Sequence, residues 1–211
     1  MRKFLLILIL VLIAITSVQL WITKDRTTQK KEIELTAPQA ELQIGGTFTL
    51  IDQMGKTVHD TDFNGRVMLV FFGFTHCPDE CPATVLMFSK MMELLGDKAD
   101  QVVPIFISVD PQRDTPEVMK NFLSNFDKRI IGLTGTPEQI KKVGEAYKIY
   151  YAKTDMSGEP VATDKKDAKT TDYAIDHSAY IYMMGKDGKY LRIYPYNITE
   201  QELVRAVGRY L

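Results

Sequence analysis

Two largely apolar runs, Arg66 to Phe72 and Val102 to Val109, most constrain how this 211-residue chain can fold. A strand that is covered on both faces reads as a continuous hydrophobic run, whereas a strand with one wet face alternates apolar and polar residues. The two runs are therefore predicted to be neighbouring buried strands at the centre of a sheet that carries helices on both faces.

Shorter elements surround these two strands. The apolar residues Val85, Phe88, Met92 and Leu95 follow a helical period, and Gly96 is a stop signal. Similar patterns predict helices at residues 82–95, 115–126, 136–147 and 199–210, and strands at 46–51, 57–59, 130–133, 178–184 and 190–194. The alternation of strands and helices predicts an α/β fold with a central mixed sheet flanked by helices.

Composition excludes several classes of protein. Hydrophobic residues make up 45% of the chain and charged residues 25%, so a wholly disordered or fibrous protein is excluded. The 26 Lys and Arg nearly balance the 27 Asp and Glu, and nucleic acid is therefore not an expected partner. Cys77 and Cys81 are the two cysteines and lie too close together to staple a fold.

The N-terminal segment Phe4 to Ile22 carries no charge. As a helix it would be about 28 Å long, close to the roughly 30 Å hydrocarbon core of a bilayer. Arg2 and Lys3 precede it and Trp21 lies near its end, as expected for an uncleaved transmembrane anchor. The alternative is a cleaved signal peptide, although the run is longer than a typical signal core and no clear cleavage site follows.

The sequence predicts three parts. Residues 1–23 are the membrane anchor, the polar residues 24–40 are a linker, and residues 41–211 form one domain. Within the domain, residues 154–172 lack apolar periodicity and are predicted to be a mobile loop. The lysines of this loop alternate with acids, which favours a solvated loop over a docking patch; they are Lys165, Lys166 and Lys169.

The reactive side chains are concentrated where the first buried strand meets its helix, in the string GFTHCPDECP. Because Pro82 disfavours helical geometry at the residue before it, we expect the helix to start at Pro82 with Cys81 as its cap. Both sulfurs would then face one pocket near a helix N-terminus, which stabilises thiolates. The spacing also permits a disulfide. Cys77 and Cys81 are therefore a redox couple or a clip for a soft metal, rather than two buried hydrophobes.

Three motifs resemble one known family. GFTHCPDECP is followed by SVDPQRDTP from Ser108 and by DYAIDH ending at His177, in the order found in the SCO/SenC family of copper-binding assembly factors for cytochrome c oxidase. The resemblance covers about residues 42–211. It implies a thioredoxin-like fold, an N-terminal membrane anchor and one copper ion held by Cys77, Cys81 and His177.

The chemistry of the residues agrees with that implication. Thiolates are soft ligands that favour Cu(I), and imidazole is a common third donor. Cu(II) is the other oxidation state that such a site could hold. Zinc usually requires a fourth ligand, for which His76 is the nearby candidate. We interpret His76 as hydrogen-bonded near the pocket and His59 as a surface residue. In a thioredoxin-like layout, His177 enters the late hairpin beside the cysteines.

Other residues with metal-binding chemistry are given structural roles. The spacing of the methionines on a helix and a strand favours core packing, which applies to Met87, Met91, Met92, Met183 and Met184. Asp110 and Asp114 could bind a cation, but a turn and a helix start explain them more simply.

Two classes of function remain. The first is a non-enzymatic copper chaperone that receives copper from an upstream donor and delivers it to the CuA site of cytochrome c oxidase subunit II. The second is an enzyme, a thiol:disulfide reductase that keeps the CuA-site cysteines reduced, or a peroxiredoxin-like peroxidase. Either function is expected outside the cytoplasm, facing the bacterial periplasm or on the mitochondrial inner membrane, where a disulfide persists.

Overall fold

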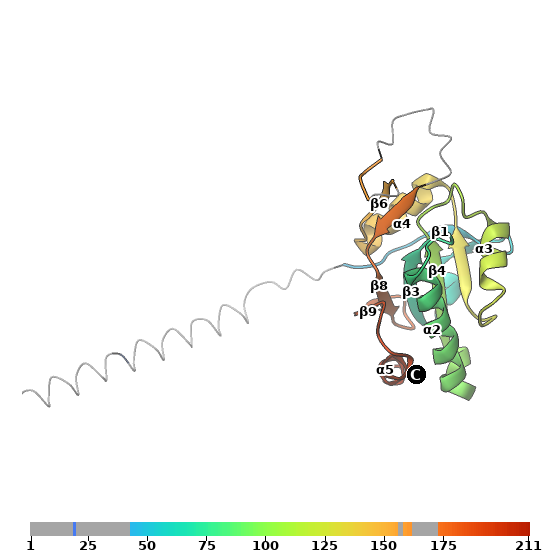
Figure 1. Ribbon diagram of the computed structural model, residues 1–211. Coiled ribbons are helices and arrows are strands. Elements are labelled where there is room, and N and C mark those ends of the chain that lie inside the picture. The colour runs from blue at the N-terminus through green and yellow to red at the C-terminus, as the bar shows by residue number, and fades with distance from the viewer. Residues whose placement is uncertain (1–18, 20–42, 156–157, 162–172) are drawn as a thin grey trace, which may run out of the picture. The chain divides into compact units, whose positions relative to one another are not determined.

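A seven-stranded mixed sheet lies at the centre of the protein (Figure 1). The computed structural model describes Gln19 and residues 43–155, 158–161 and 173–211. The strands of this sheet are β1 (Thr49–Asp52), β2 (Thr57–His59), β3 (Val67–Gly73), β4 (Val102–Ser108), β5 (Ile131–Thr134), β8 (Tyr180–Met184) and β9 (Tyr190–Pro195). Their order is β2-β1-β5-β4-β3-β8-β9.

The two central strands are the two apolar runs. Every residue of β3 and of β4 is buried. They pair in parallel from Val67 opposite Val102 to Gly73 opposite Ser108, and β5 extends the parallel part of the sheet. The outer strands pair in antiparallel hairpins. The predicted mixed sheet is confirmed, and its buried centre follows from the continuous apolar character of the two strands.

Helices cover both faces of the sheet. They are α2 (Glu80–Leu95), α3 (Pro116–Leu123), α4 (Pro137–Tyr147) and α5 (Glu200–Val207), with short 3-10 helices at Asp60–Phe63 and Gly96–Gln101. Neighbouring residues of β3 point to opposite faces. On one face, Phe71 packs against Phe106, which contacts Phe122 of α3. On the other face, Phe72 contacts Tyr147 of α4. Residues 43–211 form one compact unit.

Three predicted helix boundaries are wrong, and one of them is the end of α5, which lies at Val207 and not at residue 210. Helix α2 begins at Glu80 and not at Pro82, so Cys81 lies in the first turn and is not the cap. Proline is tolerated there because the first N–H groups of a helix have no partner within it. Helix α3 ends at Leu123 and not at residue 126, because the Ser124 hydroxyl donates to Asn121 O and the chain leaves the helix.

A second, two-stranded sheet was not predicted. It is made of β6 (Tyr151–Thr154) and β7 (Ala174–His177), which pair antiparallel with Tyr151 opposite His177. Thr154, which the sequence assigned to a loop, is therefore the end of a strand. Both strands are short and mix polar with apolar residues, so their local pattern is weak.

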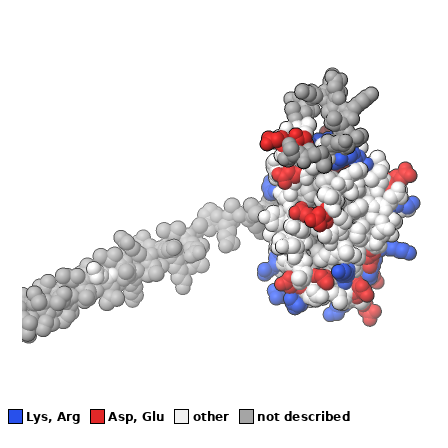
Figure 2. All heavy atoms as spheres, viewed as in Figure 1, with Lys and Arg blue, Asp and Glu red and all other residues white. Residues whose placement is uncertain are grey.

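Several predictions lie outside the described residues. These are the transmembrane segment Phe4 to Ile22 apart from Gln19, the linker 24–40, and the three loop lysines at 165, 166 and 169. In the described part of the chain, no helix has the length and apolar character that a bilayer crossing requires. Figure 2 shows one face of the domain, on which most charged side chains lie around the margin and an acidic group lies near the middle, among uncharged residues.

Candidate metal centre

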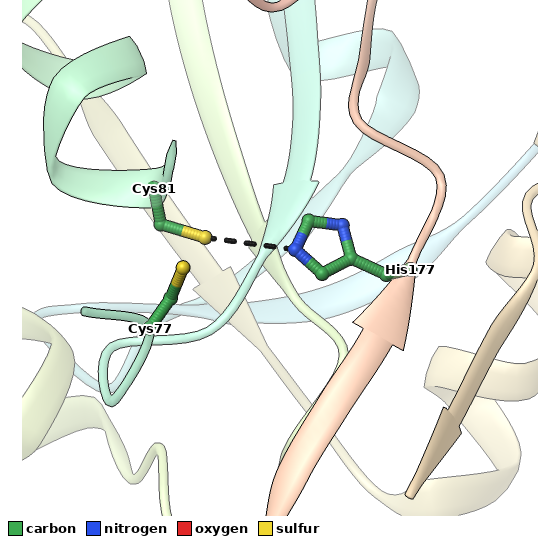
Figure 3. A group of neighbouring side chains, drawn as sticks. All are labelled: Cys77, Cys81 and His177. Atoms are coloured by element: carbon green, nitrogen blue, oxygen red, sulfur yellow. Dashed lines mark hydrogen bonds between the residues drawn. The ribbon is translucent and has the colours of Figure 1, made fainter. Parts of the chain in front are cut away.

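Three side chains from two distant parts of the chain converge at one end of the central sheet. The sulfurs of Cys77 and Cys81 and a ring nitrogen of His177 all lie within 4.8 Å of one another (Figure 3). Cys81 Sγ is 3.7 Å from His177 Nε2. The structure thus brings together the three residues that the sequence singled out, with both cysteines free.

The cysteines lie where β3 turns into α2. The backbone N–H of Cys77 donates to Phe74 O at 3.2 Å, which forms the turn after the strand. Cys81 is buried in the first turn of α2, and Cys77 is partly exposed. A Cβ atom at Gly73 would lie 2.6 Å from Cys81 Sγ, so only glycine lets the sulfur pack against the strand end. The buried sulfur and the accessible sulfur therefore have fixed and different places.

The two thiols also differ in acidity. The pKa of Cys77 is lowered to about 4, first because the Cys81 thiol donates a hydrogen bond to its sulfur, and further by His177 and by backbone N–H groups at the start of α2. Burial opposes this shift. The pKa of Cys81 is raised by its hydrogen bond to Cys77 and by burial. At neutral pH Cys77 is therefore a thiolate and Cys81 retains its proton.

His177 is oriented by aromatic rings and a carbonyl group. Its ring meets Phe71 and Phe74 edge-on, with centroids 6.2 and 5.8 Å away. Its Nδ1 lies 3.3 Å from Ser178 O. In the metal-free protein the Nε2–H donates toward the sulfurs and stabilises the Cys77 thiolate. When a metal binds, an Nδ1–H donated to the Ser178 carbonyl would leave the Nε2 lone pair free for the ion, as in many metal sites.

The group is suited to a soft metal ion. Two sulfurs and one imidazole nitrogen form the donor set that Cu(I) favours, and one sulfur is already ionised. The group can be reached through Cys77, which is partly exposed, and a hollow of about 440 Å³ that neither cysteine lines opens beside His177. Its lining includes Tyr150, Asp176, Tyr180, Pro195 and Tyr196.

The other two histidines lie outside this group. His76 Nδ1 is 3.0 Å from Thr75 Oγ1 and 3.7 Å from Asp114 Oδ1, and its side chain is half exposed. His59 is exposed on β2 and its Nδ1 lies 3.0 Å from Thr49 Oγ1. These positions agree with the sequence interpretation of a hydrogen-bonded His76 and a surface His59.

The methionines of α2 and β8 have the predicted core role. They are all buried in the main hydrophobic cluster: Met87, Met91, Met92, Met183 and Met184.

Asp114 has a larger structural role than the predicted helix start. It is fully buried and accepts hydrogen bonds from the Thr75 backbone N–H and hydroxyl at 3.0 and 2.6 Å, and from the Ser108 hydroxyl at 2.6 Å. Asp114 thereby ties the segment before Cys77 to the end of β4. Arg113 and Tyr173 carry no local sequence signal, because their roles depend on a contact between distant parts of the chain.

The folded domain, including the candidate metal centre, is similar to known proteins. Residues 36–211 match the family described as SCO1/SenC. Protein sco1 of Schizosaccharomyces pombe is 37% identical over 206 residues, which are 95% of this chain and 75% of that protein.

Two solved structures with similar folds were determined with copper bound. ScoI of Bradyrhizobium japonicum is 43% identical with a TM-score of 0.70, over 80% of this chain and 99% of that one. Yeast Sco1 is 30% identical with a TM-score of 0.69, over 79% of this chain and 87% of that one. The family match includes both segments that carry the clustered side chains.

Proposed function

The chain belongs to the SCO1/SenC family, and we propose that it is a membrane-anchored copper chaperone that delivers copper to the CuA site of cytochrome c oxidase subunit II. Its mixed sheet with flanking helices is the thioredoxin-like fold of Sco proteins. The observation that carries the proposal is the convergence of two sulfurs and one imidazole nitrogen within 4.8 Å, in a chain whose relatives bind copper.

We propose Cys77, Cys81 and His177 as the ligands of one copper ion. The Cys77 thiolate is ready to bind, because its pKa is about 4. Cys81 must lose its proton when the metal binds, so loading should release a proton. Cu(I) is the oxidation state that suits this donor set best, and Cu(II) is the second oxidation state that the site would bind. A disulfide between the cysteines would consume both thiolates and abolish Cu(I) binding.

Copper is the cargo of this protein, so the site must also release it. A three-ligand Cu(I) site leaves room for an incoming thiolate, and the partly exposed Cys77 side is where a partner's side chain could approach. The metal can then pass by ligand exchange from an upstream copper donor and on to subunit II without being free in solution.

The proposed location follows from the N-terminal sequence. The uncharged segment Phe4 to Ile22 would hold the chain in the membrane, residues 24–40 would act as a linker, and the domain 41–211 would lie outside the cytoplasm. A short linker keeps the domain near the membrane surface, where an oxidase subunit presents its copper domain. Tethering therefore raises the frequency of encounter without tight binding.

A second candidate function is supported by the unequal thiols. A partly exposed cysteine with a lowered pKa beside a buried cysteine is the arrangement of a thiol:disulfide reductase, which attacks with the first sulfur and resolves with the second. Such an enzyme would keep the CuA-site cysteines of the oxidase reduced. It needs both cysteines but has no need of His177 as a metal ligand.

The variant His177→Ala separates the two functions. X-ray absorption on the Cu(I)-loaded full-length chain should lose its single nitrogen ligand and keep two sulfurs. In cells that lack the wild-type gene, this variant should restore oxidase activity only when excess copper is added, since copper delivery needs the third ligand. Loss of the gene should lower the CuA copper content of cytochrome c oxidase more than its haem content.

Tyr190→Phe is a suitable control, because Tyr190 pairs with Met184 at the far end of the sheet. Full rescue by His177→Ala at normal copper, with equal amounts of protein, would reject the chaperone and favour the reductase.

A further inference from the structure

We propose that Asp110, Arg113 and Tyr173 form a clamp that sets the position of His177 relative to the two cysteines. The three are positioning residues, since none belongs to the group that could hold a metal ion. The inference deepens the proposed function and rests on it, because the clamp matters for copper only if His177 is a ligand.

His177 needs such support because its strand is outside the central sheet. Among the described residues, β7 pairs only with β6, so no ladder of backbone hydrogen bonds joins it to β3 or β4. After His177 the chain is fixed to the sheet, where the Tyr196 N–H donates to Ala179 O at 3.1 Å. Before His177, side chains must provide the corresponding attachment.

Tyr173, directly before β7, makes that attachment. Its hydroxyl donates to Asp110 Oδ1 at 2.6 Å, and its carbonyl accepts from Arg113 Nη1 at 3.0 Å. The Arg113 guanidinium also lies 3.6 Å from the centre of the Tyr173 ring, and Lys153 of β6 lies 4.2 Å from it. The hydroxyl, the carbonyl and the ring of one residue are thus held together.

The other side of the clamp is rigid. Asp110 is 1% exposed and is ion-paired with Arg113. Its backbone N–H donates to Ser108 Oγ at 2.9 Å, and the Ser108 hydroxyl donates to Asp114. Charge-assisted hydrogen bonds that are shielded from water are stronger and more directional than exposed ones.

The same segment therefore holds both halves of the candidate site. Asp114 binds Thr75, two residues before Cys77, while Asp110 and Arg113 bind Tyr173, four residues before His177. Residues 110–114 thus contact both the loop that carries the cysteines and the strand that carries His177, and hold the two in position relative to each other. A small displacement of Tyr173 would move the imidazole away from the sulfurs and leave the cysteine pair in place.

Tyr173→Phe is the sharpest test, because it removes one hydroxyl and keeps the ring under Arg113. Groups that orient a metal ligand typically change metal affinity by about 10-fold or more when they are lost. We expect Cu(I) affinity of the full-length chain to fall about 10-fold, with a weaker nitrogen contribution in X-ray absorption. Tyr190→Phe should leave both unchanged.

A double-mutant cycle with His177→Ala tests whether Tyr173 acts through His177. In the His177→Ala background, Tyr173→Phe should have no further effect on Cu(I) affinity, because the group it orients is gone. An equal loss in both backgrounds would show a general structural effect and overturn the clamp.

Hydrogen exchange in the metal-free protein gives a readout that does not depend on copper. Tyr173→Phe should speed exchange of the β7 amides, while β3 and β4 amides remain as protected as in the wild type. If the wild type bound no copper, the proposed function would fail while this measurement still tested the clamp. Unchanged exchange in β7 would reject the clamp.

Discussion

At the scale of single residues, Cys77 and Cys81 have different chemistry although they lie in one short junction. Cys81 is fully buried with a raised pKa, whereas Cys77 is partly exposed with a pKa of about 4. The difference arises because the two sulfurs share one proton in a hydrogen bond and because the start of α2 favours negative charge on Cys77. Cys77 is therefore the sulfur that meets an incoming metal or disulfide first.

This difference predicts how the reduced, metal-free chain reacts with iodoacetamide. Cys77 should be modified first, at a rate that hardly changes between about pH 8 and about pH 5, because its thiolate is fully formed there. The rate should fall as the pH drops through about 4, where the thiolate takes up a proton.

The control is Cys77→Ser, in which the remaining sulfur is buried and should react far more slowly. A Cys77 rate that rises about tenfold per pH unit up to about pH 8, as for an ordinary thiol, would contradict the lowered pKa.

At the scale of elements, the end of β3 and the start of α2 are packed so closely that the strand must end in glycine. A Cβ atom at Gly73 would lie 2.6 Å from Cys81 Sγ and 2.8 Å from a ring carbon of Phe106. Both neighbours are buried and cannot move aside without shifting the sheet. The close contact that places the sulfur also makes this junction sensitive to added volume.

Gly73→Ala should therefore destabilise the protein by about 1–3 kcal/mol through overpacking, and should weaken Cu(I) binding by displacing Cys81. Chemical denaturation and copper titration of the full-length chain in mild detergent measure the two effects.

Gly46→Ala is the matched control, since its Cβ would meet only Ala146 Cβ at an ordinary 3.5 Å. We expect it to change the free energy of unfolding by less than about 0.5 kcal/mol. Equal stability and copper affinity for the two variants would show that the junction can adapt.

At the scale of the whole molecule, the fold brings together residues that are far apart in the chain. Cys81 and His177 are 96 residues apart in sequence, yet their side chains are 3.7 Å apart. The middle of the face in Figure 2 carries an acidic group among uncharged residues and so offers no positive field to a polyanion. Encounter with an oxidase subunit would instead depend on where the domain is held.

Membrane tethering is tested on the full-length chain in its own membranes. If Phe4 to Ile22 forms an uncleaved span, alkaline carbonate should leave the protein in the membrane pellet. A variant that lacks residues 1–23 should be released by the same treatment.

Orientation needs a separate measurement. Two reporters are fused in turn after Leu211, one that is active only outside the cytoplasm and one that is active only inside it. We expect activity from the first reporter alone. Activity of a cytoplasmic reporter at that position, with none from an exported one, would place the domain on the other side of the membrane.

Much of the fold and part of the site could be predicted from local signals. The apolar runs of β3 and β4, the capping box of α5 at Thr199, and the paired cysteines before α2 are each visible within a few residues. His177 was singled out through the motif it shares with a family, since a lone histidine carries no such signal. The start of α2 was misplaced because Pro82 fits inside a first helical turn as well as at its beginning.

The sequence by itself determined the buried centre of the sheet and the thiol pair, because burial of continuous apolar runs and the chemistry of sulfur depend little on distant residues. Only the tertiary structure decided the pairing of β6 with β7, the burial of Asp110 and Asp114, and the contact between Tyr173 and Arg113. Each of these depends on groups that are tens of residues apart. Their interaction energy exists only after the chain has closed the loop between them.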